Sequence, residues 1–249
     1  TFNDAEFDLS AVLPSATEAS EQELMVTPVT HMAAVRVQAA VVEAAAAGEE
    51  FTGADVEGLN RATATLLGLD GIDINKVAPV DITDAEATNE GSAAAQLYGT
   101  LVASIQTLAE KDPEASIAEV IDDLAEDYAE TGGLVSNSET EETITLEEIF
   151  TGAIEVVAAA EEKAEEEGIE VDLDAAETQL DTEQAEAENA EPDVVVEVEP
   201  EVVIPEEELT QAQATQLGID LLLDLNDWED ALTAEQNETL SQPFFDQLE

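Results

Sequence analysis

The sequence predicts a mainly α-helical protein, a multi-helix bundle around a buried central helix, with short β segments near the N-terminus and at residues 193–205. Apolar residues recur at three- and four-residue spacing over several stretches, which is the period of an amphipathic helix. Capping residues and glycines stand at the ends of these stretches. Hydrophobic residues make up 44% of the chain but aromatic residues only 4%, so the expected core is built from small side chains.

The N-terminal region, residues 1–23, is expected to contain a short strand and a linker. Apolar and polar residues alternate over residues 7–13, and this period of two is typical of a strand. Pro14 would end the strand, and residues 15–23 form a polar linker.

The central helix is predicted over residues 27–48. Thr27 is suited to the N-cap position, and Pro28 to the first helical turn, where its missing N–H costs nothing. Gly48 follows the last apolar residue and suits a left-handed C-terminal cap. Alanine, valine and methionine fill most of the positions between them, so this helix is expected to pack on several sides.

The helices that follow are expected to complete a bundle over residues 24–167. Each has a start or stop signal of its own, such as the capping box formed by Thr145 and Glu148. A loop at residues 68–82 contains apolar residues and is expected to pack against the bundle. The charged end of the last helix is expected to project into solvent. The predicted helices are 53–67, 93–110 (after a cap at Thr83 or Asp84), 117–130 and 146–167.

The rest of the chain divides into an acidic connector, residues 168–205, and a C-terminal helical segment, residues 206–249. Residues 168–192 are acidic and rich in alanine, which is compatible with a weakly packed helix. Residues 193–205 are β-branched and flanked by prolines, which indicates an extended linker or a strand. Leucine, tryptophan and phenylalanine recur in the last segment, so it is expected to dock through an apolar face.

The charge of the chain excludes several classes of partner. There are 62 acidic residues against 5 lysines and arginines, a formal net charge of −57. Nucleic acids and anionic membrane surfaces both require a basic face. The central helix contains Arg36 and Glu43 and few strong hydrophobes, so membrane insertion is not expected. Self-repulsion indicates a protein that works in salty or divalent-rich water, either inside a halophile or, as we favour, in a marine extracellular setting.

Cysteine is absent from the sequence, which excludes disulfides, thiol catalysis and cysteine-based zinc sites. No signal peptide is visible and the first residue is Thr1, so we expect a mature or excised form.

Catalytic patterns are weak. His31 is the only histidine, and no GxSxG context accompanies it, so we expect it to pack in the first turn of the central helix. Pairs of carboxylates could hydrolyse glycosides, but with 62 acids such pairs arise by chance. We therefore predict that the chain is not an enzyme and has no organic cofactor.

Calcium is the one cofactor that the composition favours, because hard oxygen ligands suit this ion. Two groups of acidic and amide residues are candidates, but neither follows the order of ligands in an EF-hand loop. We therefore expect loose association of divalent cations with the surface, and a specific calcium site is a second, more demanding hypothesis. The candidate ligands are Asp70, Asp73, Asn75 and Asp81 in the 68–82 loop, and Asp224, Asn226, Asp227 and Asp230 near Trp228.

Residues 193–205 are the strongest candidate for an interaction with another chain. Glutamates 197, 199 and 201 would face water, while valines on the other side of the strand add to the sheet of a neighbouring subunit. The alternatives are an acidic linker, or a strand that pairs with residues 7–13 of the same chain. The candidate contact residues are Val194, Val196, Val198 and, beyond Pro200, Val202 and Val203.

A stretch of the chain resembles a known module. Residues 26–30 (VTPVT) begin an alanine-rich helix, residues 66–70 (LLGLD) follow, and then Pro79 and Tyr98. Over roughly residues 24–135 this order is similar to an α-helical module of large acidic surface proteins and lipoproteins of marine Gammaproteobacteria. There a VTPLT helix start follows an immunoglobulin-like β domain. This chain has valine at position 29 where leucine is usual, and His31 where threonine is usual. The resemblance implies an exported, non-enzymatic role and implies nothing about residues 140–249.

Three functions follow from these observations. The first is an extracellular or cell-surface structural or assembly protein, a filament or matrix subunit whose copies exchange strands. Its partner would be itself, as a homo-oligomer or polymer. The alternative is a helical interaction module of an adhesin-like surface lipoprotein that binds a partner or a polysaccharide. An acidic halophilic enzyme is the third and least supported hypothesis, because no nucleophile motif or cofactor loop is visible in the sequence.

Overall fold

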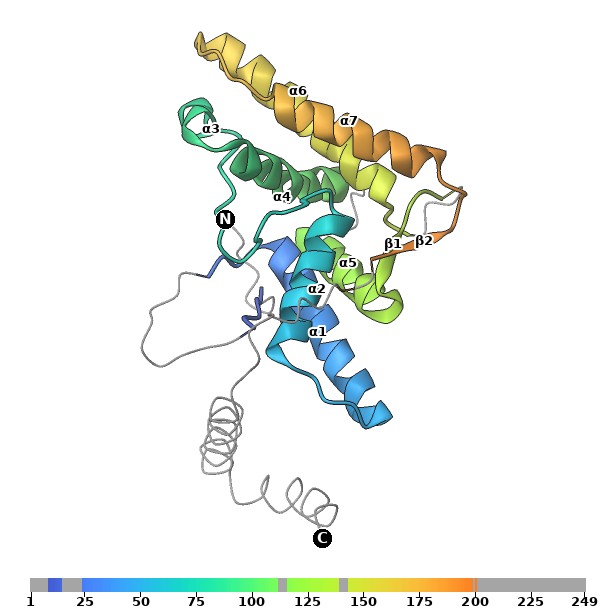
Figure 1. Cartoon of the computed structure of the whole chain (residues 1–249). Helices are drawn as coiled ribbons and strands as arrows, with labels where there is room; N and C mark the ends of the chain where they lie inside the picture. The colour runs from blue at the N-terminus through green and yellow to red at the C-terminus, as the bar shows by residue number, and fades with distance from the viewer. Residues whose placement is uncertain (1–8, 15–23, 112–115, 139–142, 199, 201–249) are drawn as a thin grey trace, which may run out of the picture. The chain divides into compact units, whose positions relative to one another are not determined.

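Seven α-helices and one two-stranded antiparallel sheet make up the part of the chain that the structure describes (Figure 1). The structure is a computed structural model, and it describes residues 9–14, 24–111, 116–138, 143–198 and 200. The mainly α fold class with short β segments is confirmed. The chain divides into two compact units, Thr1–Val203 and Ile204–Glu249. The predicted C-terminal helical segment, residues 206–249, lies outside the described residues.

Helix α1, Pro28–Ala47, has the predicted ends. The Thr27 hydroxyl accepts from the Thr30 N–H, the Thr30 hydroxyl accepts from the Thr27 N–H, and Gly48 closes the helix with a φ of 73°. The expectation that this helix packs on several sides holds only for its first half. Its buried residues end at Val37, and beyond that position the side chains are partly or fully exposed. In this second half Ala40 packs against a small cluster that includes Val37 and two residues of α2.

The bundle places α1 against α5 and α4 against α6. One apolar cluster runs through these helices and contains the two buried tyrosines, Tyr98 and Tyr128. The predicted third helix is two helices, because the backbone at Gly91 is extended (φ −72°, ψ 151°) and ends α3 before α4 begins. The helices of this part are α2 Gly53–Leu66, α3 Ala85–Glu90, α4 Ala93–Lys111, α5 Ile117–Thr131 and α6 Leu146–Glu167.

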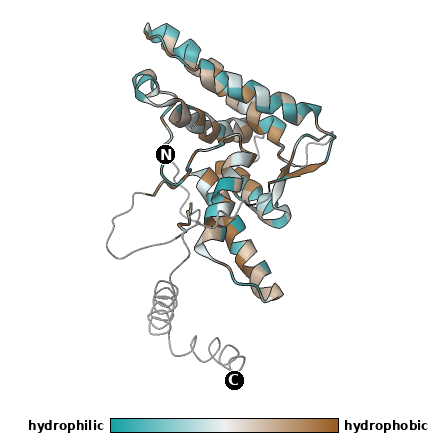
Figure 2. Cartoon of the chain, viewed as in Figure 1, coloured by the Kyte–Doolittle hydropathy of each residue, from teal (hydrophilic) through white to brown (hydrophobic). Residues whose placement is uncertain are grey.

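Helix α7, Asp174–Asn189, packs along α6 as the second arm of a helical hairpin (Figure 1). The expectation of weak packing for residues 168–192 is therefore wrong. Hydrophilic residues cover much of both helices (Figure 2), but Leu173, Ala176, Leu180 and Ala187 of the second arm are buried. The charged end of α6 is mostly exposed, as expected, and Ala164 is its one buried residue.

The sheet pairs β1, Gly133–Val135, with β2, Val195–Glu197. A strand within residues 193–205 is therefore present, and it pairs inside the chain, with Leu134 opposite Val196. A Cβ on Gly133 would clash with the Val196 carbonyl oxygen, so glycine permits this close approach. Strand β1 is not predicted from the sequence, because the two glycines at 132 and 133 indicate only the end of a helix.

Residues 9–14 form no strand, so the predicted strand over residues 7–13 is wrong for residues 9–13. Residues 7 and 8 lie outside the described residues. The segment bonds to side chains rather than to a neighbouring strand. The Val12 carbonyl accepts from Asn60 Nδ2, and the Ser10 N–H donates to His31 Nδ1. Leu9 packs against the main core. The segment is thus fixed to the bundle without regular structure.

Candidate functional site

Five valines are the exposed large hydrophobic side chains in the described part of the chain, and four of them form two sequence-local pairs. Val41 and Val42 lie on the exposed half of α1, with 42% and 69% of their surface accessible. The only acid between residues 38 and 48 is Glu43, and its carboxylate lies 3.1 Å from Arg36 Nη1. This part of α1 is therefore apolar and electrically neutral on a chain of net charge −57.

The second pair lies at β2 and includes two of the predicted contact residues. Val194 and Val196 are 45% and 37% exposed, whereas Val198 packs against the core. Ser136 supports this arrangement, since its N–H donates to the Val194 carbonyl. The predicted contact residues Val202 and Val203 lie outside the described residues. The structure thus leaves Val194 and Val196 available for contact and does not present Val198 on the same surface.

The acids predicted to bind calcium in the 68–82 loop are each engaged locally. Asp70 accepts from the Thr65 hydroxyl at 2.7 Å. Asp73 accepts from the Asn75 N–H and from Lys76 Nζ, the latter at 2.7 Å. Asp81 accepts from the N–H and hydroxyl of Thr83, and these bonds lower the pKa of its carboxyl. The structure does not gather these side chains into one group. The second predicted set, Asp224, Asn226, Asp227 and Asp230, lies outside the described residues.

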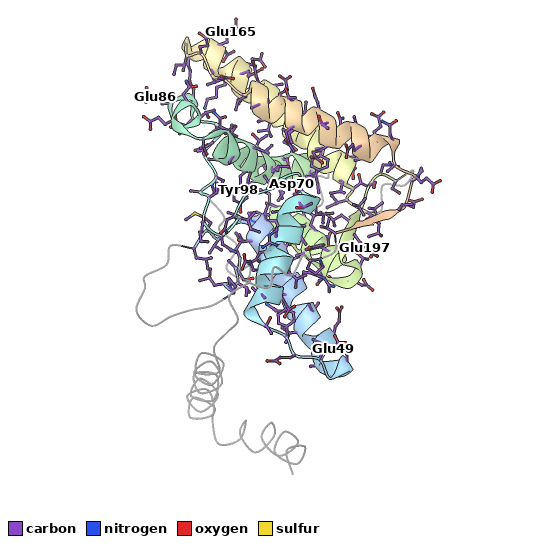
Figure 3. All side chains as sticks on the ribbon, in the orientation of Figure 1. Glu49, Asp70, Glu86, Tyr98, Glu165 and Glu197 are labelled. Atoms are coloured by element: carbon purple, nitrogen blue, oxygen red, sulfur yellow. The ribbon has the colours of Figure 1, made fainter. Side chains whose placement is uncertain are left out.

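A different acidic group does form in the α6–α7 hairpin. Carboxylate oxygens of Glu161, Asp174 and Glu177 lie within 4.8 Å of one another, the only such cluster within the described ranges. The sequence does not predict this cluster, because Glu161 and Asp174 come together only through the packing of α7 on α6. Elsewhere the acidic charge is spread over the surface, as Figure 3 shows for Glu49, Glu86 and Glu197.

A cavity of about 570 Å³ lies between the N-terminal segment, α2 and the loop at residues 71–76. Two ion pairs line it: Arg61 Nη2 lies 3.1 Å from Glu57, and Lys76 Nζ lies 2.7 Å from Asp73. The four charges cancel formally. Apolar parts of the lining come from Leu13, Pro14, Ile72 and Ile74.

Two buried asparagines also line this cavity. Asn60, 7% exposed, donates from Nδ2 to the Val12 carbonyl at 3.1 Å, and this bond leaves its Oδ1 as the free acceptor. Asn75, 4% exposed, is held by its backbone, since its carbonyl accepts from the Met25 N–H at 3.0 Å. Within the described residues, Oδ1 of both asparagines is buried without a hydrogen-bond donor. Asn75 was singled out from the sequence, whereas Asn60 was not, because nothing local to α2 indicates a site.

His31 lies between a serine and an aspartate that are distant from it in the sequence. The Ser10 hydroxyl lies 3.0 Å from Nδ1, and Asp122 Oδ1 lies 3.7 Å from Nε2. These are the residue types of a hydrolytic triad, but the Ser10 N–H points at His31 instead of at a substrate oxyanion. Burial lowers the pKa of His31, and Asp122 partly offsets that shift. The contact joins the N-terminal segment to α1 and α5, and the absence of enzyme activity stays a prediction.

No protein-family model matches the chain, and no curated protein or solved structure matches it either. Among the helices that the structure describes, none combines the length and hydrophobicity needed to cross a membrane. The likeness to a surface-protein module over residues 24–135 therefore stays a prediction.

Proposed function

We propose that this chain is a structural or assembly protein of the cell surface or extracellular space, and that its partner is a second copy of itself. The observation that carries the proposal is the placement of the exposed valines. Val41 with Val42, and Val194 with Val196, form two apolar pairs on a surface that is otherwise rich in acids. Exposed apolar groups of this kind gain free energy when a partner covers them.

The choice of a second copy rests on charge. Two chains of net charge −57 repel each other, and the repulsion is smallest where neither chain presents an unpaired acid. The exposed half of α1 meets this condition, because Glu43 is paired with Arg36. An isologous contact would place the same neutral patch of both copies together. Nucleic acids and anionic surfaces require a basic face, and the whole sequence contains only 5 lysines and arginines.

Strand exchange is the second element of the proposal. β2 contains only three residues, and among the described residues the other edge of each strand has no ladder partner. The pairing of Gly133–Val135 with Val195–Glu197 inside one chain can also form between two copies, with the same register. The exchanged strand would bring Val194 and Val196 to the boundary between the copies.

The test measures the mass of the full chain by light scattering, and its shape by negative-stain microscopy, over increasing NaCl and with millimolar Ca²⁺. We expect association to increase with NaCl, because salt screens the repulsion between copies. The double variants Val41→Thr/Val42→Thr and Val194→Thr/Val196→Thr keep the β-branched shape and should lower the assembled fraction.

Val26→Thr is the matched control, because Val26 is 49% exposed and belongs to neither pair. It should assemble like the unmodified chain. A monomer under every condition would overturn the proposal, and so would an equal loss of association in the control.

A further inference from the structure

We propose that residues 9–14 are an exchangeable peptide, and that the surface of α1 and α2 that they cover binds the same residues of a second copy in the assembled protein. The inference rests on the self-association proposed above, and it adds a contact that contains none of the exposed valines. Residues 9–14 have no regular structure, yet the bundle holds them from Leu9 to Pro14.

The apolar side chains of the segment pack against the bundle at two places. Leu9 packs against the main core, and Val12 packs against a small cluster formed by α1 and α2. The buried members of this cluster are Val37, Val56 and Leu59. A Cβ on Gly53, the first residue of α2, would clash with the Pro14 carbonyl, so glycine lets the segment lie close to the helix. Each copy is therefore more stable when such a peptide covers this surface.

Two side chains of the bundle bond to the backbone of the segment. His31 Nδ1 accepts from the Ser10 N–H at 3.2 Å, and Asn60 Nδ2 donates to the Val12 carbonyl at 3.1 Å. Folded domains recognise separate peptides in this way, through bonds to the main chain and contacts with selected side chains. The covered surface thus has the properties of a peptide-binding site that the chain's own N-terminal segment occupies.

The contacts do not require that the segment and the bundle belong to the same chain. The bonded residues are 21 and 48 positions apart in the sequence. Residues 15–23 connect the segment to the bundle, and nine extended residues reach at most about 30 Å. A neighbouring copy within this distance can receive the segment with every contact preserved. Such an exchange of one element between copies has a low free-energy cost.

The charge of the segment favours a second copy as its acceptor. Residues 9–14 (LSAVLP) contain no ionisable side chain, although the chain has a net charge of −57. Repulsion between acids opposes contacts between copies, but it does not act on these six residues. Once copies associate, the local concentration of a neighbour's segment approaches that of the chain's own tethered segment. Exchange then competes with docking inside one chain.

The experiment relies on the absence of cysteine from the sequence, which makes each introduced cysteine unique. Leu13 of the segment and Glu57 of α2 line the same cavity. Full chains with Leu13→Cys and with Glu57→Cys are mixed in low salt and then brought to a NaCl concentration at which light scattering shows association. A short bis-maleimide is added, and mass spectrometry identifies products that join residue 13 of one chain to residue 57 of another.

Leu13→Cys mixed with Glu86→Cys is the matched control, because Glu86 is an exposed glutamate of α3 that does not line the cavity. We expect the product of the first mixture to exceed that of the control about tenfold, since a docked segment holds the two cysteines near each other. The double variant Leu13→Cys/Glu57→Cys tests the reach of the reagent. In low salt it should be linked within one chain.

The outcomes separate this proposal from the proposed function. If the chains associate but the mixture yields no more product than the control, exchange of residues 9–14 is wrong and self-association stands. If light scattering shows monomers in every salt concentration, both proposals are overturned. If the double variant is linked neither within a chain nor between chains, the segment does not dock beside α2, and the exchange is overturned as well.

Discussion

The backbone N–H and the side-chain hydroxyl of Ser10 both lie within hydrogen-bond distance of His31 Nδ1, at 3.2 and 3.0 Å. Because an N–H group only donates, Nδ1 must be the acceptor, so the ring hydrogen belongs on Nε2, which faces Asp122. The neutral imidazole therefore bonds a segment without regular structure to the first turn of α1. This arrangement makes the docking of residues 9–14 dependent on the protonation of one side chain.

Acid should weaken this docking. Burial lowers the pKa of His31 below its ordinary value of 6.5, so the unfolded chain takes up the proton first as the pH falls. The stabilisation is therefore complete above about pH 6.5 and is lost progressively below it. Protonation also puts a hydrogen on Nδ1, which then opposes the Ser10 N–H. We expect the free energy of unfolding, measured by urea denaturation, to fall as the pH is lowered below about 6.5.

His31→Asn is the control for this prediction, because its amide oxygen can accept from Ser10 and does not titrate. Burial raises the pKa of the Asp127 and Glu183 carboxyls, which has the opposite effect on stability in acid. Both carboxyls are present in the unmodified chain and in His31→Asn, so their contributions cancel when the two pH profiles are subtracted. If the unmodified chain and the variant have parallel pH profiles, the role assigned to His31 is wrong.

The hydroxyl of Tyr98 connects α1, α4 and the loop at residue 74. It lies 2.6 Å from the Thr27 hydroxyl and donates to the Ile74 carbonyl at 3.2 Å. We expect Tyr98→Phe to lower the free energy of unfolding by about 1–3 kcal/mol at neutral pH, because both partners lose a bond in a buried place. Urea denaturation measures this change.

Alkaline pH gives a second readout for the same variant. Burial raises the pKa of Tyr98 from 10.0 to about 12, so the phenol stays neutral to a higher pH in the folded chain than in the unfolded chain. The contribution is present below pH 10 and is lost as the pH rises toward 12. Tyr98→Phe should flatten this decline. Tyr128, whose pKa burial also raises, remains in the variant, so an unchanged slope would contradict the assignment to Tyr98.

Helix boundaries could be predicted from the sequence because their signals are local. The caps at Thr27, Ser116 and Thr145 are formed by residues three positions apart, and each is present in the structure. The pairing of β1 with β2 and the docking of α7 on α6 depend on which distant surfaces meet. No periodicity in one segment contains that information.

The candidate site shows the same difference between local signals, which the sequence contains, and contacts between distant segments, which it does not. Asp73 and Asn75 were selected because a loop rich in oxygen ligands suggested calcium, but Lys76 occupies Asp73. Asn60 could not be connected to them, because only the fold brings α2 beside the loop. Likewise Ser10 and Asp122 come from two separate segments to reach His31.

The packing of α7 makes a third prediction. Leu180 is 1% exposed, in a segment whose composition indicated only a connector. Leu180→Ala should lower the free energy of unfolding by about 2–5 kcal/mol, since it removes buried methyl groups and leaves a cavity. Val42→Ala is the comparison, because Val42 is 69% exposed and should change stability by less than about 0.5 kcal/mol. Equal, small effects in urea denaturation would show that α7 is not part of the core.

Salt should stabilise the folded chain. With a net charge of −57, the compact state brings acids together that the unfolded chain keeps apart. The screening length falls from about 10 Å at 0.1 M salt to about 3 Å at 1 M, so NaCl should raise the midpoint of thermal unfolding.

A charge-reduced variant separates screening from other effects of salt. The last turn of α6 contains exposed acids and no base, which opposes the helix dipole. Glu165→Gln/Glu166→Gln keeps the helical propensity and removes two charges there. The variant should unfold at a higher temperature than the unmodified chain in low salt, and the difference should vanish in high salt. A difference that persists undiminished in molar NaCl would show that repulsion among the acids does not limit the stability of this fold.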